Sequence, residues 1–286
     1  MKEIESRSNP IIKRALKAIN DPNKENRILV EGYKLLGEAL KSGAKPEMIF
    51  VENEGNGLPP LPQCFALQPP QSLRDSSPIY GGASSIHKND FYNYENITYK
   101  VSRGLMRELS TVQTPSEIIA FLTPCPAPNL DEVVKKAEML VVLDRLQDPG
   151  NIGTIMRTSE ALGASAIILL KGCCNPNNHK VIRAAMGSSF RLPVIANVDV
   201  QNFFTILNKN GYMTICADMK GTNLKNFNFA EKTALFMGQE GQGLSDIIIA
   251  NCKARVSIPM YGQVESLNVA TSTAICLYEW ARSKRD

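Results

Sequence analysis

The second half of the chain alternates short apolar runs with segments of helical periodicity. Runs such as MLVVL (139–143), AIILL (166–170) and ALFMG (234–238) contain almost no polar residue, as is typical of strands buried on both faces of a sheet. Helical segments, among them residues 178–189, separate these runs, and strands joined by helices pair in parallel. The alternation therefore predicts an α/β domain whose mostly parallel sheet is covered by helices on both faces.

The length of the chain predicts two domains. Its 286 residues exceed the usual size of one compact domain, and the segment CPAPNLDE (125–132) has the composition of a linker. We expect a smaller N-terminal α/β domain over residues 1–123, a linker over residues 124–136, and the larger α/β domain over residues 137–286.

The N-terminal segment predicts a helix with a basic polar face. Apolar residues recur at helical spacing over residues 6–19, and Asn9 followed by Pro10 is a typical helix start. Segment 27–52 then has the pattern of a strand, a helix and a strand, whereas residues 58–99 are loop-like. The polar face of the first helix carries Lys13, Arg14 and Lys17.

Composition argues against several classes of protein. The seven cysteines are scattered, form no CxxC pair, and are accompanied by only two histidines, so neither a metal site nor a disulfide framework is expected. The apolar runs are far shorter than the ~20 residues of a membrane span, and the N-terminus lacks the apolar core of a signal peptide. We therefore expect a cytoplasmic protein with reduced thiols, no membrane association and no metal.

A first motif, DPGNIGTIMRTSEALGA (148–164), follows the strand at 139–143. Asn151 and Arg157 lie six residues apart on the expected helix, so we expect them to project from broadly similar faces. The start of a helix offers free N–H donors to an anion, and arginine adds a planar fork that suits phosphate. The alternative is that Asn151 only caps the helix and Arg157 is a solvated surface residue.

A second motif, LFMGQEGQGL (235–244), is rich in glycine. Gly238, Gly241 and Gly243 allow the backbone to approach a ligand closely, and Glu240 places a carboxylate among them. The GxxGxG spacing differs from the GxGxxG fingerprint of dinucleotide-binding folds. The alternative is a tight connection without a ligand.

A third motif, IPMYGQVESLNVATSTA (258–274), joins a strand to a long C-terminal helix. In the simpler interpretation, Ser266 caps an amphipathic helix that packs in the core through Leu277 and Trp280. In the other, this loop and the turn at Gly238 together form a pocket lined by backbone.

The three motifs, in this order and spacing, resemble those of the SpoU (TrmH-like) RNA 2'-O-methyltransferases of the SPOUT superfamily. The resemblance implies a deep trefoil knot, which is otherwise nearly absent from proteins, and bound S-adenosylmethionine. It also implies a homodimer, formed through the C-terminal domain, in which an arginine reaches the partner's cofactor site. The substrate would be ribosomal RNA (23S) or transfer RNA, selected by the N-terminal domain.

Matching the motifs residue by residue gives the expected site. Arg157 corresponds to the catalytic arginine, and because arginine stays protonated we interpret it as a clamp on phosphate and developing alkoxide. The other acceptor-site residues are Asn151, Glu240, Ser266 and Asn268, and the cofactor-binding residues are Met237, Gly238, Ile258, Pro259, Leu267 and Asn268. Lys13, Arg14 and Lys17 are the expected RNA contacts of the N-terminal domain.

Two other functions are compatible with parts of the sequence. A non-catalytic RNA-binding or assembly protein could keep the fold, although it would be expected to lose Asn151, Arg157 and Glu240. A nicotinamide-dependent dehydrogenase could use a similar sheet, but the GxGxxG segment is missing. The segment 58–99 looks lengthened relative to the family, and it bears on which RNA is chosen.

Overall fold

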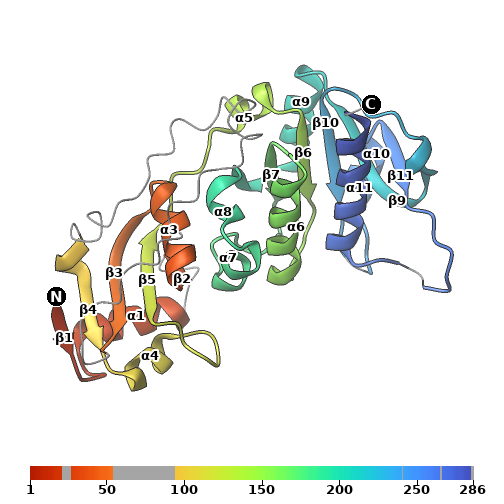
Figure 1. Ribbon diagram of the computed structural model, residues 1–286. Helices are drawn as coiled ribbons and strands as arrows, with labels where there is room; N and C mark the ends of the chain where they lie inside the picture. The colour runs from red at the N-terminus through yellow and green to blue at the C-terminus, as the bar shows by residue number, and fades with distance from the viewer. Residues whose placement is uncertain (21–26, 54–93, 240, 265, 285–286) are drawn as a thin grey trace. The chain divides into compact units, whose positions relative to one another are not determined.

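The chain forms two compact units, Met1–Cys125 and Pro126–Asp286 (Figure 1). Each has its own sheet and its own buried core. The computed structural model describes residues 1–20, 27–53, 94–239, 241–264 and 266–284. Most of the loop-rich stretch 58–99, together with Glu240, lies outside these residues.

The first unit is a five-stranded mixed sheet with helices packed against it. The strand order is β1-β4-β3-β5-β2, in which β1, β4 and β3 pair in parallel and β5 runs antiparallel to both β3 and β2. The expected helix start is confirmed, because the Asn9 side chain accepts a hydrogen bond from the Ile11 N–H at 2.9 Å. The elements are β1 (Lys2–Ile4), α1 (Pro10–Asn20), β2 (Ile28–Glu31), α3 (Tyr33–Lys41), β3 (Lys45–Glu52), β4 (Thr98–Val101), α4 (Arg103–Leu109) and β5 (Ile118–Thr123).

The second unit is a six-stranded sheet in the order β11-β9-β10-β6-β7-β8. Every neighbouring pair in it is parallel, so the predicted parallel sheet is confirmed. Its strands are β6 (Met139–Leu143), β7 (Ala166–Leu170), β8 (Val194–Val198), β9 (Met213–Asn223), β10 (Thr233–Met237) and β11 (Ala254–Ser257). Its helices are α5 (Leu130–Lys136), α6 (Pro149–Ala161), α7 (His179–Ala185), α8 (Ser188–Arg191), α9 (Val200–Lys209), α10 (Asp246–Asn251) and α11 (Val269–Ser283), with a short 3-10 turn η4 (Leu224–Asn226).

Helices bury both faces of this sheet, as the apolar strands require. Alternate residues of β6 belong to different cores: Val141 packs in a cluster with α6, α7 and α11, whereas Val142 packs with α5, α9 and α10. All five residues of β6, β7 and β10 are buried. The three central strands therefore hold the sheet in place and fix where each connecting loop emerges.

Two segments differ from the sequence-based expectation. Residues 130–136, expected within the linker, form α5, which packs with α9 in the second unit. The expected helix over residues 178–189 is broken into α7 and α8 by Met186 and Gly187, which both have positive φ angles of 51° and 96°. Such backbone angles end an α-helix.

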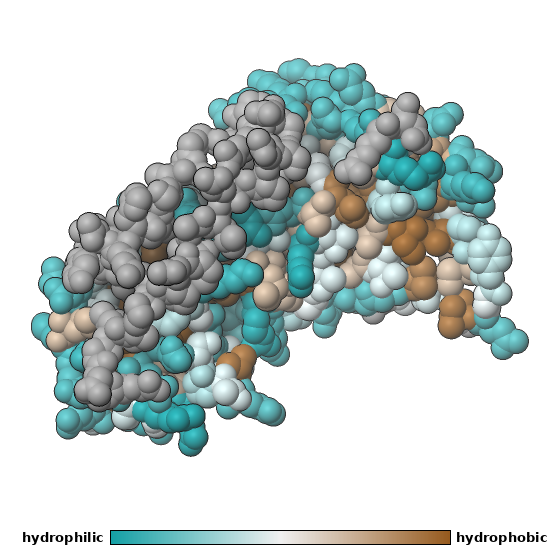
Figure 2. All heavy atoms as spheres, in the orientation of Figure 1, coloured by the Kyte–Doolittle hydropathy of each residue, from teal (hydrophilic) through white to brown (hydrophobic). Residues whose placement is uncertain are grey.

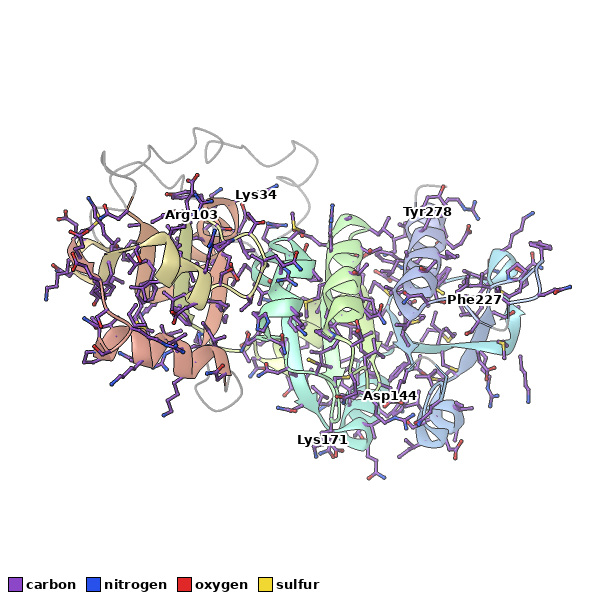
Figure 3. The ribbon with its side chains drawn as sticks, turned by 90° about the horizontal axis from the view of Figure 1, so that it is seen from below. Lys34, Arg103, Asp144, Lys171, Phe227 and Tyr278 are labelled. Atoms are coloured by element: carbon purple, nitrogen blue, oxygen red, sulfur yellow. The ribbon has the colours of Figure 1, made fainter. Side chains whose placement is uncertain are left out.

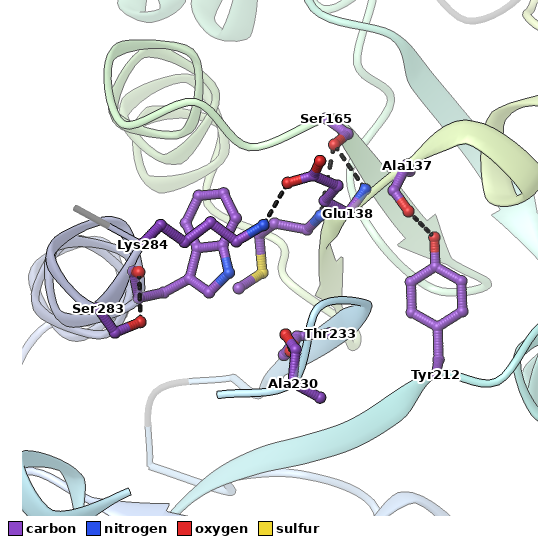
Figure 4. Close-up of polar contacts among 10 residues, drawn as sticks. Ala137, Glu138, Ser165, Tyr212, Ala230, Thr233, Ser283 and Lys284 are labelled. Carbon is purple, nitrogen blue, oxygen red and sulfur yellow. Dashed lines mark hydrogen bonds and ion pairs between the residues drawn. The ribbon is translucent and has the colours of Figure 1, made fainter. Parts of the chain in front are cut away.

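Polar contacts fasten the edge of the sheet where β6 and β10 begin (Figure 4). The buried Tyr212 hydroxyl donates to the carbonyls of Val134 at 2.9 Å and Ala137 at 2.6 Å. Burial, with the nearby charge of Glu138, raises the pKa of Tyr212 far above its ordinary value. The phenol therefore stays protonated and fixes the end of α5 to the start of β9.

Candidate active site

The three sequence motifs begin at one edge of the parallel sheet. Because the strands run the same way, the carboxyl ends of β6, β10 and β11 all lie at this edge. Asp144 follows β6, Gly238 follows β10 and Ile258 follows β11. Open parallel sheets bind their ligands beside this edge, so the fold assembles the motifs where a binding site is expected.

One hydrogen bond joins the first motif to the third. Asn268 donates from Nδ2 to Oδ1 of Asn151 at 2.9 Å, although 117 residues separate them in sequence. Asn268 also caps α11, since its Oδ1 accepts from the N–H groups of Ala270 at 2.9 Å and Thr271 at 3.3 Å. Asn268, and not Ser266, is therefore the helix cap, and both of its side-chain atoms are used.

A carboxylate and an arginine that directly follow β6 hold the second motif in place. Asp144 is 4% exposed, and its Oδ2 accepts from the Ser245 N–H at 2.9 Å and from Arg145 Nε at 3.2 Å. Arg145 also donates to the Gly243 carbonyl at 3.3 Å. Asp144, labelled in Figure 3, thus holds the glycine-rich loop against the end of β6.

These two residues were not among the sequence-based candidates. The available signal was an acidic residue directly after a buried apolar strand, where a carboxylate needs a hydrogen-bond partner. Its partner, Ser245, lies 101 residues away, so the sequence pattern gave no means of finding it.

Gly238 is required by its own loop. A Cβ atom there would lie 2.4 Å from the carbonyl carbon of Gly243 and 2.5 Å from the nitrogen of Leu244, closer than real Cβ contacts allow. The expectation that glycine is needed for a ligand to approach is thus corrected, because chain atoms fill that space. The loop folds back on itself, and the Gly243 N–H donates to the Gln239 carbonyl at 2.9 Å.

The other expected cofactor residues lie on the same edge with different exposures. Met237 is buried, and its carbonyl accepts from the Asp144 N–H at 2.9 Å. Ile258 and Leu267 are partly buried, whereas Pro259 and Ser266 are exposed. The end of β10 is therefore more deeply buried than the loop that leads into α11.

Arg157 lies on a different side of α6 from Asn151. Six residues along a helix amount to a turn of roughly 240°, so the two side chains point about 120° apart. Asn151 points toward Asn268 of α11, while Arg157 is exposed and has no hydrogen-bond or ion-pair partner among the described residues. The expectation that both project from similar faces is therefore wrong. An unpaired, exposed guanidinium is free to bind a phosphate.

Burial keeps the Cys173 thiol near this edge in its neutral form. Burial raises the pKa of Cys173 to about 11, and its Sγ–H donates to the Leu143 carbonyl at 3.2 Å. A neutral thiol is a poor nucleophile. The geometry thus favours chemistry that relies on positioning and charge rather than on a cysteine nucleophile.

The basic face of α1 is only partly available to a ligand. Arg14 donates to Glu47 Oε2 at 2.7 Å, and Arg27 donates to the same oxygen at 2.9 Å. Burial would raise the pKa of Glu47, but hydrogen bonds from Arg27 and Thr123 and the charge of Arg14 outweigh it and lower the pKa. The Lys13 side chain is exposed and is the better candidate for an RNA contact.

Within the described parts of both units, no three His, Cys, Asp or Glu side chains are grouped as metal ligands would be. Nor is any helix in those parts long and apolar enough to cross a bilayer.

Comparisons with known proteins agree with this geometry. Residues 138–278 match the SpoU rRNA Methylase family, and residues 9–120 match the MRM3-like substrate binding domain. A 23S rRNA (guanosine(2553)-2'-O)-methyltransferase, RlmP of Bacillus subtilis, is 30% identical over 97% of this chain and 98% of its own length. The chain belongs to the SpoU rRNA methylase family.

Other matches support the same assignment. A 23S rRNA (guanosine-2'-O-)-methyltransferase, RlmB of Ralstonia nicotianae, is 36% identical over 55% of this chain and 65% of its own length. The crystal structure of an AdoMet-bound rRNA methyltransferase from Sinorhizobium meliloti covers 99% of this chain and 98% of that one, with a TM-score of 0.79 and 26% identity. The predictions of an RNA ribose methyltransferase and of S-adenosylmethionine as its cofactor are confirmed.

The close contact at Gly238 predicts that adding a single methyl group there disturbs the loop. Gly238→Ala should force residues 238–244 to move and weaken binding of S-adenosylhomocysteine by about tenfold or more, because a loop of the expected cofactor site is displaced. Calorimetry measures the affinity. The single tryptophan, Trp280, lies in the core of the second unit, so its fluorescence during urea unfolding reports whether that unit stays folded. Unchanged affinity in a folded variant would show that this loop does not hold the cofactor.

Proposed function

We propose that this enzyme transfers the methyl group of S-adenosylmethionine to a ribose 2'-hydroxyl of ribosomal RNA. The observation that carries the proposal is the exposed Arg157, which has no partner among the described residues and lies on α6, the helix whose start carries Asn151 to the sheet edge where the three motifs meet. The named activities of RlmP and RlmB favour 23S ribosomal RNA. Transfer RNA is the second candidate, since other relatives are named tRNA/rRNA methyltransferases.

In this proposal the cofactor lies against backbone at the ends of β10 and β11. Main-chain groups of Gly238, Ile258 and Leu267 hold its adenine and ribose, with Met237, Pro259 and Asn268 adjacent. Support comes from the tight anchoring of these segments by Asp144 and by the Asn268–Asn151 hydrogen bond. The knot implied by the resemblance belongs to the same proposal, because it would thread these two segments together.

Arg157 serves the RNA side of the reaction. The sulfonium activates the methyl carbon, so the protein mainly has to align the 2'-oxygen, the methyl group and sulfur. A guanidinium that grips a neighbouring phosphate orients the ribose, and its positive charge stabilises oxygen as the proton leaves. Glu240, Ser266 and Asn151 complete the acceptor site in this proposal.

The direction of Arg157 supports a homodimer with composite sites. Within one protomer it points away from the Asn151–Asn268 pair, so it is better placed to serve a site on another chain. Apolar residues gather over α11 and the segment before it in Figure 2, and Tyr278 of α11 is 57% exposed. Such a face is suited to an interface between two copies.

The first unit selects the RNA in this proposal. It matches a substrate binding domain, and the near balance of charges in the second unit gives that unit little excess charge for holding a polyanion. A cytoplasmic location is part of the same proposal, and it is supported by the free state of every described cysteine.

Arg157→Ala should abolish methyl transfer and leave S-adenosylhomocysteine affinity within about twofold, because the side chain faces away from the cofactor loops. Arg157→Lys should restore little activity, since lysine keeps the charge but lacks the planar fork. Tritium transfer to total RNA from a deletion strain measures the activity. Lys209→Ala, which removes an exposed charge at the end of α9, is the control. An Arg157→Ala enzyme with activity near that of wild type would refute this role.

Composite sites predict complementation between Arg157→Ala and Gly238→Ala, assayed at an S-adenosylmethionine concentration low enough that the weakened cofactor affinity leaves the Gly238→Ala homodimer nearly inactive. A heterodimer of one Arg157→Ala chain and one Gly238→Ala chain contains one intact site, so an equal mixture should recover about a quarter of wild-type activity. Subunit exchange is verified by mass spectrometry with one isotope-labelled chain. If exchange occurs and no activity returns, each site lies within a single protomer.

A fragment of residues 126–286 tests the division of labour. It retains both buried cores of the second unit, so its S-adenosylhomocysteine affinity should be close to that of the full chain. Its affinity for ribosomal RNA at moderate salt should fall about tenfold or more, because the phosphate contacts of the first unit are lost. Replacing Lys13 and Lys17 by glutamine in the full chain should make RNA affinity depend less steeply on salt concentration, because contacts to phosphate are lost. A fragment that methylates RNA as well as the full chain would assign the first unit another role.

A further inference from the structure

Met186 stands out among the exposed apolar residues of the second unit. It is 50% exposed, and its φ of 51° and ψ of 37° place it in the left-handed region. A residue with a Cβ atom adopts this conformation only at an energetic cost. The turn that it forms with Gly187 separates α7 from α8.

This turn lies beside Arg157. Gly153 lies one turn before Arg157 on the same face of α6, and α7 packs directly against it. A Cβ atom at Gly153 would lie 2.5 Å from Ala184 Cβ and 2.9 Å from Ala185 N. Three residues after Arg157, the Glu160 carboxylate accepts from Arg191 Nη2 at 2.8 Å. Gly153 and Glu160 flank Arg157 on this face of α6, and they contact α7 and α8 respectively. The turn that joins α7 to α8, Met186–Gly187, therefore lies opposite Arg157.

The other two described non-glycine residues with positive φ have local explanations. Arg145 is held by its contacts with Asp144 and the Gly243 carbonyl, and Asn197 is of a residue type that tolerates this region. Met186 donates its N–H to the Arg183 carbonyl at 3.2 Å, a helix-ending bond that glycine would make without strain. Capping α7 therefore explains the turn but not the methionine.

We propose that Met186 contacts the base of the nucleotide whose ribose is methylated. This inference rests on the proposed role of Arg157 in holding that nucleotide. A side chain next to the phosphate clamp can reach the adjacent base, and an unbranched, polarisable thioether packs against the flat face of any base. An extruded base needs such an apolar surface once it has left its neighbours in the RNA.

The left-handed conformation provides a sharp test. Met186→Gly removes the side chain and relieves backbone strain, so Trp280 fluorescence should show equal or greater resistance to urea. S-adenosylhomocysteine affinity should stay within about twofold. The KM for total RNA from a deletion strain should rise about tenfold, which is the size of effect found when a base loses one stacking partner. Met186→Leu, which keeps an apolar side chain of similar size, should recover most of the loss.

Met219→Ala is the matched control, because Met219 is a more exposed methionine, at 76%, on the distant strand β9. Its KM for RNA should be unchanged. An unchanged KM for RNA in Met186→Gly would overturn the inference. A change in dimer dissociation, measured by sedimentation, without the rise in KM would also overturn it. Arg157→Ala is assayed in parallel. If that variant is inactive while Met186→Gly is normal, only the inference about Met186 fails; an active Arg157→Ala enzyme refutes the proposed function itself.

Discussion

The pairing of β10 with β6 is the constraint on which the site depends. Five consecutive residue pairs align, from Thr233 with Met139 to Met237 with Leu143, and every one of these side chains is buried. The ladder continues past the strands, since the Asp144 N–H donates to the Met237 carbonyl at 2.9 Å. The first two motifs must therefore leave the sheet side by side. A shift of one residue would move every side chain of the strand to the opposite face and disrupt the packing of both cores.

Close packing then sets the arrangement of the loops. Gly238 lets residues 243 and 244 fold back onto the end of β10, and Gly153 lets α7 approach α6. The same rigid helix α6 directs Asn151 toward α11 and Arg157 toward the turn between α7 and α8. A single protomer therefore separates Arg157 from the loops that follow β10 and β11. The proposed homodimer would bring Arg157 of one chain to these loops of the other without moving either element.

Much of this arrangement could be predicted from the sequence, for physical reasons that differ by element. Continuous apolar runs identify buried parallel strands, and Asn9 before Pro10 identifies a helix start, because both signals are local. The bond between Asp144 and Ser245 could not be predicted, since it depends on how the whole sheet folds. The break at Met186 was missed because methionine favours helices, although Gly187 directly after it was an available signal.

Strain distinguishes residues that serve the fold from residues that serve another molecule. Arg145 holds an unfavourable φ of 55°, and its hydrogen bonds within the chain account for that cost. Met186 holds a similar angle, but half of its side chain remains in water, and a glycine would form the same turn more easily. No contact among the described residues of the folded chain compensates for the strained backbone of Met186. A ligand that packs against the exposed side chain would explain why methionine is found there. The position of this turn beside Arg157 makes the acceptor nucleotide the ligand that fits.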